Sequence, residues 1–437
     1  MTVIGLDDTD SRERGMCTTY VADRLAARIE ADGGRVERRL LVRLNPGVAH
    51  KTRGNAALAV HTDLGHERAL ELAREYLDLA ETADPKTNPG VVVAPGDPGD
   101  PDAIPDAVAA FAREAVRDYH DVTDAALLAD GAGYGTVHAG NGRGRIGALA
   151  AVGAWRAFDD WTYEHISYRE RGRWGTDRDV DPASVRDAAD AAYPAVWDTI
   201  DCESGYPVCV PRTPCPVLHG IRGDDPAAVR AVADDIESEP VARHALFVTN
   251  QGTDAHLRSV DSLAAVRDGR AYRVTGDVVT APETREGGHV FVRIGDGPSD
   301  DSGGGSGADS DTLACAAFEP TKRFRDRIRA LRVGDRVTAC GEVSDGTLKL
   351  EKFAVRELVR TESAPPKCPD CGRSMGSAGA GQGYRCRDCT TSAPGKVERP
   401  VERDLEVGWY EVPPVARRHV AKPLVRGGFD APTHPER

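Results

Sequence analysis

The chain has 437 residues, of which 40% are hydrophobic, and this composition predicts a globular protein of about two to four domains. No apolar run approaches the roughly 18 residues of a membrane helix, which excludes a membrane-spanning protein. The first residues lack the layout of a signal peptide, so we expect a cytoplasmic location. The formal net charge of −14 argues, taken alone, against nucleic acid as a partner.

The basic residues carry a second compositional signal. Only 8 of the 56 basic residues are Lys, and the remaining 48 are Arg. Asp-rich, Lys-poor composition resembles the proteins of salt-loving archaea, in which an acidic surface is a general solubility device. The acidic excess therefore says little about the partner, and the places where Arg residues cluster matter more.

The N-terminal part of the sequence alternates strand and helix patterns. A short apolar strand is expected over 3–6, and a helix from residue 18 that ends at the glycines 33–34. Strands over 40–44 and 56–61 flank a polar loop, 45–55. A helix over 67–79, a strand over 91–93 and helices up to about residue 130 follow. We place this α/β domain at residues 1–138.

Two further domains are expected after a Gly-rich junction at 131–147. The first, at 139–262, combines the apolar stretch 146–157 with a helix over 226–238 and a strand over 245–248, which fits a ferredoxin-like sandwich. From residue 271 several short strands favour a small β-barrel of the OB-fold type at 270–360. The acidic segment 299–311 interrupts it as a flexible insertion, and no internal sequence repeat is present.

Four of the ten cysteines have metal-ligand spacing. Cys368 and Cys371 form one C-x-x-C pair, and Cys386 and Cys389 form a second pair fourteen residues later. Two such turns make a closed tetrahedral site, which suits a structural zinc ion, with an iron–sulfur centre as the alternative. We expect a zinc ribbon at 366–392, followed by a peripheral Arg- and Pro-rich tail at 393–437.

Acidic residues follow the first expected strand. Asp7, Asp8 and Asp10 would repel one another unless a divalent cation lay between them, and oxygen ligands suit magnesium, which in turn suits ATP. The alternative is a helix-capping loop of solvated acids. Thr18 and Thr19 stand just before a helix, where amide groups can hold an anion or where one hydroxyl is a plain N-cap.

Two loops could clamp phosphate groups. The loop 45–55 carries His50, Lys51, Arg53 and Asn55, and the segment 140–147 carries Asn141 and Arg143. A surface loop is the alternative in both cases. The polar loops 211–216 and 247–256 could hold a site or be structural turns.

The best candidate for a nucleic-acid surface lies in the expected barrel. The segment 321–332 is locally basic and includes Lys322, Arg323, Phe324 and Arg325, a combination that binds single strands by charge and stacking. The alternative is a solvated helix face.

Taken together, these pieces resemble one family, the archaeal tRNA(isoleucine) 2-agmatinylcytidine synthetases (TiaS). The resemblance spans the whole chain. It rests on the zinc ribbon and on seven motifs: Ile4-Gly-Leu-Asp-Asp-Thr-Asp10, Gly15-Met-Cys-Thr-Thr-Tyr20, Arg43-Leu-Asn-Pro, Lys51-Thr-Arg-Gly-Asn55, Gly140-Asn-Gly-Arg-Gly, Ile146-Gly-Ala-Leu-Ala-Ala and Thr249-Asn-Gln-Gly-Thr-Asp-Ala-His256.

The resemblance implies a kinase-like domain, a ferredoxin-like domain, an OB-fold and a zinc ribbon. It implies an ATP-dependent ligase that joins agmatine to carbon-2 of the wobble cytidine of a CAU-anticodon isoleucine tRNA, through a phosphorylated cytidine. The expected cofactors are ATP, magnesium and zinc, and the expected partners are that tRNA and agmatine. The sequence indicates no protein partner.

The resemblance also implies roles for particular residues. Asp7, Asp8 and Asp10 would hold magnesium and the phosphates, and Thr18 would accept a phosphate. On their own chemistry, rather than through the resemblance, Lys51, Arg53, Asn55, Asn141 and Arg143 are our candidates for ATP and phosphate contacts. Agmatine carries a guanidinium group, which needs carboxylates or carbonyls, and Asp201 and Glu203 are candidates.

Two rival functions are carried forward. One is another magnesium-dependent phosphotransferase or phosphatase acting on RNA, although the order Asp-Asp-Thr-Asp is one position away from the D-x-D-x-[T/V] pattern of haloacid-dehalogenase-like enzymes. The other is a non-enzymatic single-strand nucleic-acid-binding protein, which would leave the first 260 or so residues unexplained.

Overall fold

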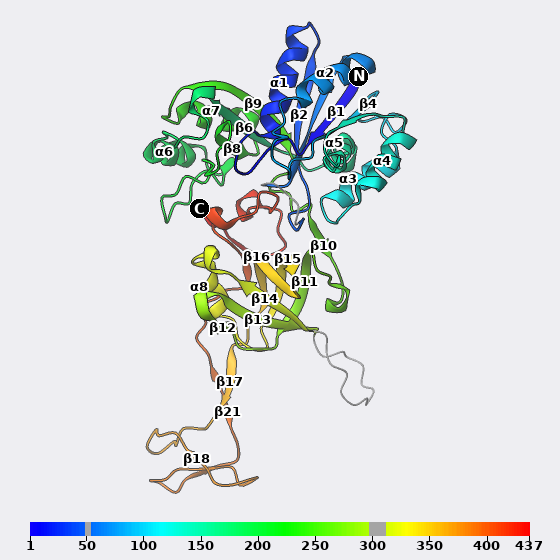
Figure 1. Cartoon of the computed structure of the whole chain (residues 1–437). Coiled ribbons are helices and arrows are strands. Elements are labelled where there is room, and N and C mark those ends of the chain that lie inside the picture. The colour runs from blue at the N-terminus through cyan, green and yellow to red at the C-terminus, as the bar shows by residue number, and fades with distance from the viewer. Residues whose placement is uncertain (49–53, 297–311) are drawn as a thin grey trace.

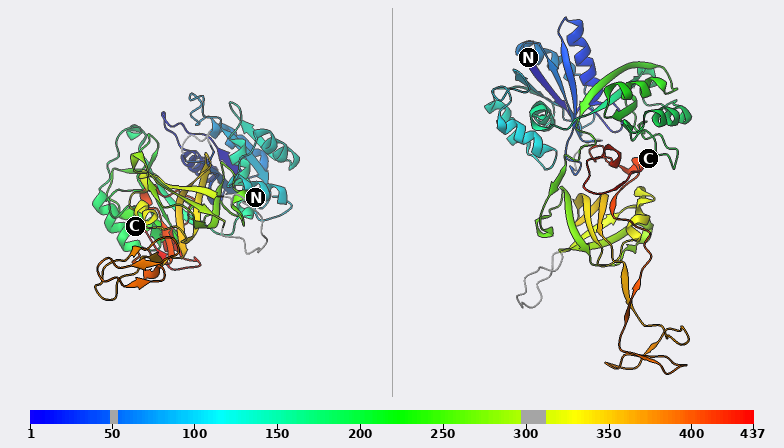
Figure 2. Two further views of the ribbon diagram at one scale, coloured as in Figure 1. Left: turned by 90° about the horizontal axis from the view of Figure 1, so that it is seen from below. Right: turned by 180° about the vertical axis from the view of Figure 1, so that it is seen from behind.

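The structure, a computed structural model, describes residues 1–48, 54–296 and 312–437. The molecule is elongated: an α/β lobe forms one end, a β-barrel lies below it, and a small ribbon stands at the far end of a two-stranded arm (Figures 1 and 2). His50, Lys51 and Arg53 and the acidic segment 299–311 lie outside the described residues.

One sheet runs through the whole α/β lobe. Its nine described strands have the order β5-β4-β1-β3-β2-β9-β6-β8-β7. The strands of its first half are β1 (Thr2–Asp7), β2 (Val36–Arg43), β3 (Ala56–Thr62), β4 (Gly90–Pro95) and β5 (Gly135–His138). The helices of this half are α1 (Thr18–Ala31), α2 (His66–Leu77), α3 (Asp106–Ala115), α4 (Val122–Gly131) and α5 (Arg145–Ala157).

Helices cover both faces of this first half because its strands bury side chains on both sides. Val3 packs on the face covered by α3, α4 and α5, whereas Ile4 and Leu6 pack on the face covered by α1 and α2. Helix α5, which follows the boundary expected at residue 138, packs on β1, β3 and β4. Residues after position 138 therefore complete the hydrophobic core of the first half of the sheet.

The second half of the sheet is joined to the first edge to edge. It consists of β6 (Thr162–Arg169), α6 (Pro182–Ala192), β7 (Val196–Trp197), β8 (Val217–Gly223), α7 (Pro226–Asp235) and β9 (Val241–Thr249). Strand β9 pairs in parallel with β2, with Leu40 opposite Val248 and Leu41 opposite Thr249. Both halves place a β-α-β-β-α-β succession in the same spatial order, β4-β1-β3-β2 and β9-β6-β8-β7.

Five described strands close into the predicted barrel. Strand β11 pairs with β13, β13 with β14, β14 with β16, β16 with β15, and β15 again with β11. The barrel elements are β10 (Leu257–Ser259), β11 (Ala271–Val278), β12 (Glu283–Thr284), β13 (Val290–Gly295), β14 (Thr312–Ala317), α8 (Phe324–Arg329), β15 (Arg336–Ser344) and β16 (Thr347–Glu357).

The ribbon projects from the barrel on a two-stranded arm. The arm pairs β17 (Thr361–Ala364) with β21 (Val397–Pro400). Between them lie β18 (Gly376–Ser377), β19 (Tyr384–Arg385) and β20 (Ser392–Ala393), which form a three-stranded sheet. The ribbon has its own small core, made of Cys368, Met375 and Cys386 with partly buried neighbours.

The C-terminal segment is not the peripheral tail that its composition predicts. Strand β22 (Gly408–Glu411) pairs with β16, and β23 (Thr433–His434) pairs with β22. Trp409 and Leu424 are each 1% exposed. Backbone N–H groups of Gly252 and Thr253 donate to carbonyls of this segment, which ties it to the lobe. Apolar residues spaced among the Arg and Pro residues dock the segment between lobe and barrel. Their burial stabilises this position although the segment as a whole is polar.

Candidate active site

Three aspartates stand at the end of β1: Asp7 is its last residue, and Asp8 and Asp10 follow it. The Asp8 backbone adopts a positive φ of 57°, and its N–H donates to Asp7 Oδ1 at 2.7 Å. Arg143 Nη2 and the Asn88 N–H donate to Asp8 Oδ2 at 2.8 and 3.1 Å. Among the described residues, the carboxylates of Asp7, Asp8 and Asp10 do not gather into a cluster within 4.8 Å. Asp7 and Asp8 are the pair linked by this hydrogen bond, and Asp10 lines the same cavity.

The electrostatics of this pair favour a bound cation. Burial raises the pKa of Asp7 well above its ordinary value, and the charge of Asp8 raises it further. Burial also raises the pKa of Asp8, against the opposing effect of Arg143. Two buried carboxylates that resist ionisation are stabilised in their charged form by a divalent cation, and oxygen donors suit magnesium. The residues present therefore fit a magnesium ion.

A cavity of about 390 Å³ opens in front of these carboxylates, and we call it the acidic cavity. Its walls include several of the predicted site residues, namely Asp7, Asp8, Asp10, Asn55, Asn141 and Arg143. The first turn of α5 also lines it, through Ile146 and Gly147, and no acidic residue stands in that turn. A helix N-terminus with an adjacent arginine is a site for an anion such as phosphate.

The opposite wall of the acidic cavity was missed by sequence reasoning. It consists of residues 118–122, the connection between α3 and α4, with Tyr119 47% exposed. This connection lies more than a hundred residues from Asp7 and carries no motif. Only the packing of α3 against α5 brings it to the site.

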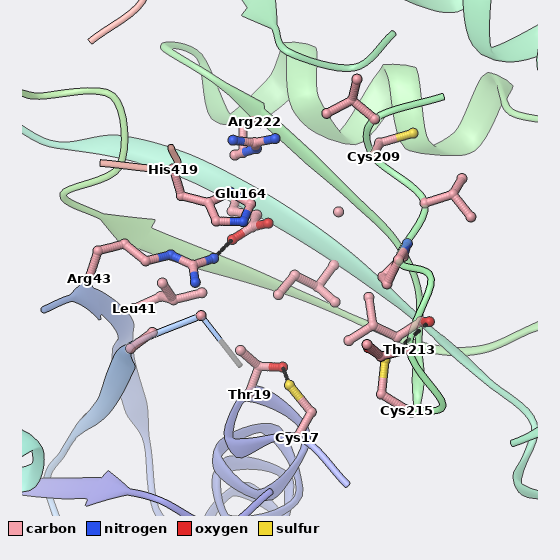
Figure 3. A pocket seen from close by; sticks show the side chains of 18 of the residues that line it. Cys17, Thr19, Leu41, Arg43, Glu164, Cys209, Thr213, Cys215, Arg222 and His419 are labelled. Atoms are coloured by element: carbon pink, nitrogen blue, oxygen red, sulfur yellow. Dashed lines mark hydrogen bonds and ion pairs between the residues drawn. The ribbon is translucent and has the colours of Figure 1, made fainter. Parts of the chain in front are cut away.

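A second cavity of about 520 Å³ is lined by residues of β2, β3, β6 and β8, and we call it the basic cavity (Figure 3). Thr18 and Thr19 line it, whereas Asp7 and Asp8 line the acidic cavity. Asp10, Gly54 and Ala56 line both cavities and form their shared wall. The charged groups and the histidine that line this cavity are Asp10, Arg43, Glu164, Arg212, Arg222, Arg417 and His419, and sequence reasoning assigned no role to Glu164 or Arg222.

Polar side chains hold the carboxylate of Glu164 in place at this cavity. Gln251 Nε2 donates to Glu164 Oε2 at 2.5 Å, and Arg43 Nη2 lies 3.9 Å from the same carboxylate oxygen. Thr9 Oγ1 donates to Thr18 Oγ1 at 3.1 Å. The Thr18 hydroxyl is therefore held at the N-terminus of α1, beside the cavity that Thr18 lines.

The carboxylates predicted for agmatine lie elsewhere. Asp201 is 1% exposed, and neither Asp201 nor Glu203 lines the acidic or the basic cavity. Both face Arg323, whose guanidinium lies 3.5 Å from Asp201 and 2.9 Å from Glu203. An arginine of this chain thus already occupies the position that a ligand guanidinium would need.

The predicted nucleic-acid segment divides into buried and exposed side chains. Phe324 is 1% exposed and packs against Phe353 in the barrel core, so its ring is unavailable for base stacking. Arg323 pairs with the lobe, as just described. Lys322 is exposed, and Arg325 Nη1 donates to the Gly288 carbonyl at 2.6 Å.

Two aromatic rings for which sequence analysis predicted no role lie near Arg325. Phe291 and Phe318 are partly exposed, with ring centroids 6.2 Å apart. The guanidinium of Arg285 stands 4.2 Å from the centroid of the Phe291 ring. We call Arg285, Phe291, Phe318, Lys322 and Arg325 the barrel patch. Rings beside arginines suit unpaired nucleotides.

The four ribbon cysteines form the metal-binding group that their spacing predicts. Their Sγ atoms all lie within 4.8 Å of one another, and those of Cys371 and Cys386 are 3.6 Å apart. Tetrahedral zinc with Zn–S bonds of about 2.3 Å places its sulfurs roughly 3.8 Å apart. The residues therefore fit a zinc ion. Among the described residues this is the one group of three or more potential ligands so arranged.

Comparison with known proteins identifies the family of this chain. Three family models match the chain: the TiaS TCKD domain over residues 3–73, the TiaS FLD domain over 142–256 and the TiaS C-terminal zinc ribbon domain over 365–405. The tRNA(isoleucine) 2-agmatinylcytidine synthetase TiaS of Haloquadratum walsbyi is 55% identical, with 100% of both chains covered. The chain belongs to the TiaS family. The TiaS of Methanosarcina acetivorans is 44% identical, with 97% of each chain covered.

Solved TiaS structures share this fold along their whole length. The complex of TiaS with isoleucine tRNA and ATP superposes with a TM-score of 0.87 at 39% identity, covering 100% of this chain and 99% of that one. The complex with tRNA, AMPCPP and agmatine gives a TM-score of 0.84 at 37% identity, with the same coverage. In the described parts of the chain, no helix is long and apolar enough to cross a membrane.

Proposed function

We propose that this chain is an ATP-dependent ligase that conjugates agmatine to carbon-2 of the wobble cytidine in CAU-anticodon isoleucine tRNA. The observation that carries this function is the 55% identity to the TiaS of Haloquadratum walsbyi along the entire length of both chains. The solved TiaS complexes hold the three matching substrates: tRNA, ATP or its analogue, and agmatine. The product, agmatidine, reads AUA codons.

The chemistry requires activation of a poor leaving group. The carbon-2 oxygen of cytidine leaves readily only after it has been phosphorylated. The agmatine amine then attacks carbon-2, so that a C–N bond forms, the C–O bond breaks, phosphate departs with that oxygen, and the amine loses a proton. The enzyme must therefore hold a phosphoryl donor, an extruded base and agmatine close together.

The two cavities provide such an arrangement. ATP would occupy the acidic cavity, with its phosphates facing Arg143, Asn141 and the first turn of α5. Magnesium would be held by Asp7 and Asp8 and would neutralise phosphate charge during transfer. Asn55 lines the same cavity. Lys51 and Arg53 remain predictions for phosphate contact.

The wobble cytidine and agmatine would occupy the basic cavity. Asp10 belongs to both cavities, and Thr18 faces the basic one. This position suits Thr18 as a phosphate acceptor beside the reacting base. Glu164 is the buried carboxylate in this cavity and is better placed than Asp201 or Glu203 to receive a cationic group of agmatine.

Strand order and helix packing support the proposed domain assignments. The β9-β6-β8-β7 order with α6 and α7 supports a ferredoxin-like second domain, for which we keep residues 139–262. The closed barrel supports an OB-fold at 270–360. In the kinase-like domain at 1–138, the sheet would be covered in part by α5, which lies after residue 138. The ribbon at 366–392 would hold zinc.

The barrel patch would contact the tRNA. Lys322 and Arg325 remain candidates for phosphates, and Phe291 and Phe318 would stack on unpaired bases. Arg323 and Phe324 would support this surface from within rather than touch RNA.

Agmatine incorporation tests the function. Purified protein, ATP, magnesium and labelled agmatine are incubated in high salt with an unmodified CAU-anticodon isoleucine tRNA, and with methionine tRNA as the control. We expect label in the isoleucine tRNA alone, and its loss in Asp7→Ala and Asp8→Ala. Absence of label with folded, zinc-loaded, tRNA-binding wild-type protein would overturn the assignment.

A further inference from the structure

Three basic side chains converge on the basic cavity from distant parts of the chain. Arg43 ends β2, Arg222 lies on β8, and His419 belongs to the C-terminal segment (Figure 3). The charge of Arg43 lowers the pKa of His419 well below its ordinary value. Burial lowers the pKa of Arg43, and Arg222 adds to that effect although Glu164 opposes it. The three groups are therefore close enough to repel one another.

The surrounding protein does not fully satisfy the two guanidinium groups. Arg222 is 3% exposed, yet its Nη1 has no hydrogen-bond acceptor among the described residues and lies 3.7 Å from Asp198 Oδ2. That carboxylate also pairs with Arg417. Arg43 donates to Gln251 at 3.2 Å, but its Nε lacks an acceptor in the described chain. Buried donors without acceptors carry a desolvation cost that a bound anion would remove.

The N-terminus of α1 adds further donors to the same space. Cys17, its N-cap residue, makes no side-chain capping hydrogen bond, and no acidic residue stands in the first turn. Cys17, Thr18 and Thr19 all line the basic cavity. Forked guanidinium groups and the N–H groups of a helix N-terminus match the oxygens of a phosphoryl group.

We propose that the basic cavity contains a phosphoryl-group site, in which Arg43, Arg222 and the first turn of α1 bind the phosphate oxygens. This inference rests on the proposed function, because it states where the activated intermediate is held. The phosphoryl group could belong to the phosphorylated cytidine, to a phosphorylated Thr18 or to free phosphate after agmatine attack. All three present the same tetrahedral oxyanion to the site.

Binding of a phosphoryl group would also change the contact between Arg43 and Glu164. A phosphoryl group beside Arg43 would compete for the guanidinium and release the Glu164 carboxylate, which lies only 3.9 Å away. Glu164 would then be free to accept the proton or the positive charge of the incoming agmatine amine. Loading of the phosphoryl group would thereby prepare the cavity for agmatine.

Phosphate binding to the full-length, zinc-loaded protein provides the first test. Inorganic phosphate is added at constant potassium chloride, and thermal unfolding and the fluorescence of Trp197, whose ring lies 5.8 Å from the Arg222 guanidinium, are followed. We expect saturable stabilisation of the wild type. In Arg43→Gln and Arg222→Gln the phosphate affinity should fall by about tenfold or more, with partial recovery in Arg222→Lys. Arg28→Gln, an exposed change on α1, should behave as wild type.

ATP labelled in its γ-phosphate distinguishes the sources of the phosphoryl group. With tRNA present and agmatine omitted, label on RNA identifies the phosphorylated cytidine, and label on protein that is lost in Thr18→Ala identifies the threonine. Arg222→Gln should lose retained label in either case. In a parallel reaction with agmatine added, label that stays on the protein as free phosphate identifies the product.

Equal phosphate affinity in wild type and both Gln variants, together with normal agmatine incorporation, would overturn the inference and leave the proposed function intact. Failure of the wild type to incorporate agmatine would instead overturn the function. Arg222→Gln could lose phosphate affinity only because it destabilises the fold. Arg222→Lys keeps the positive charge beside Asp198, so its phosphate affinity separates loss of the site from loss of stability.

Discussion

Gly147 lies directly against the Asp7 carboxylate: a Cβ atom at Gly147 would stand 2.6 Å from Asp7 Cγ and still closer to Oδ2. Glycine is therefore required in the first turn of α5 for steric reasons, because the aspartate fills the space that any other side chain needs. This contact fixes the carboxylate relative to the helix N-terminus, and both line the acidic cavity.

Gly147→Ala should inactivate the enzyme without unfolding it. We expect phosphoryl transfer to tRNA to fall about 100-fold, since displacing a catalytic carboxylate by roughly 1 Å has that effect. ATP-dependent agmatine incorporation and thermal unfolding measure the two properties. Gly131→Ala is the matched control, because a Cβ at that helical position meets no atom within 4 Å. If Gly147→Ala retained full activity, the placement of Asp7 in the reaction would be wrong.

Buried histidines should make the fold sensitive to acid. Burial lowers the pKa of His165 and of His219 to about 4, and that of His61 to about 3. Because these values lie below the ordinary value of 6.5, the neutral rings stabilise the fold above pH 6.5, and this contribution is lost as the pH falls toward 4. Each ring accounts for about 1.4 kcal/mol per pH unit.

Denaturant unfolding between pH 4 and 7 checks this expectation. His219→Leu should flatten the pH dependence of the unfolding free energy by about one proton, and His138→Gln, at an exposed position, should not change it. An unchanged slope in His219→Leu would show that this ring does not titrate on unfolding.

Phe291 and Phe324 should separate RNA binding from stability. Phe291→Ala removes a partly exposed ring that lies under Arg285, so tRNA affinity should fall by about 1–3 kcal/mol with little loss of stability. Phe324→Ala opens the barrel core and should cost about 3–5 kcal/mol of unfolding free energy. Filter binding of tRNA and denaturant titration measure the two effects. Normal tRNA affinity in Phe291→Ala would exclude the barrel patch as a stacking surface.

Zinc removal should affect the ribbon and spare the rest of the molecule. The Cys368 and Cys386 side chains belong to a core separate from those of the barrel and the lobe. Cys386→Ser or strong chelation should release about one zinc ion per chain and loosen residues 366–392, while the main unfolding transition stays in place. Metal analysis and limited proteolysis report these outcomes, and Cys202→Ser serves as a control outside the ribbon. A large fall in the main transition would show that the ribbon supports the whole fold.

The sequence by itself determined the features whose physics is local. A short apolar strand followed by Asp7 and Asp8 predicts where carboxylates emerge from a sheet, and the structure places them there. Two C-x-x-C turns predict that Cys368, Cys371, Cys386 and Cys389 form one metal-binding group, and the structure brings their sulfurs together. The four barrel strands expected from alternation also form, because each strand buries one face.

Tertiary structure decided the features that depend on pairing across the chain. The basic cavity exists because β9 pairs with β2 and because the C-terminal segment docks beside them, which brings Arg43, Arg222 and His419 together. No local pattern encodes such contacts, since they depend on which apolar faces are buried against each other. Phe324 illustrates the same limit: its basic neighbours indicate a solvated surface, yet the ring packs inward with Ile328, one helical turn away, because burying both outweighs exposing them.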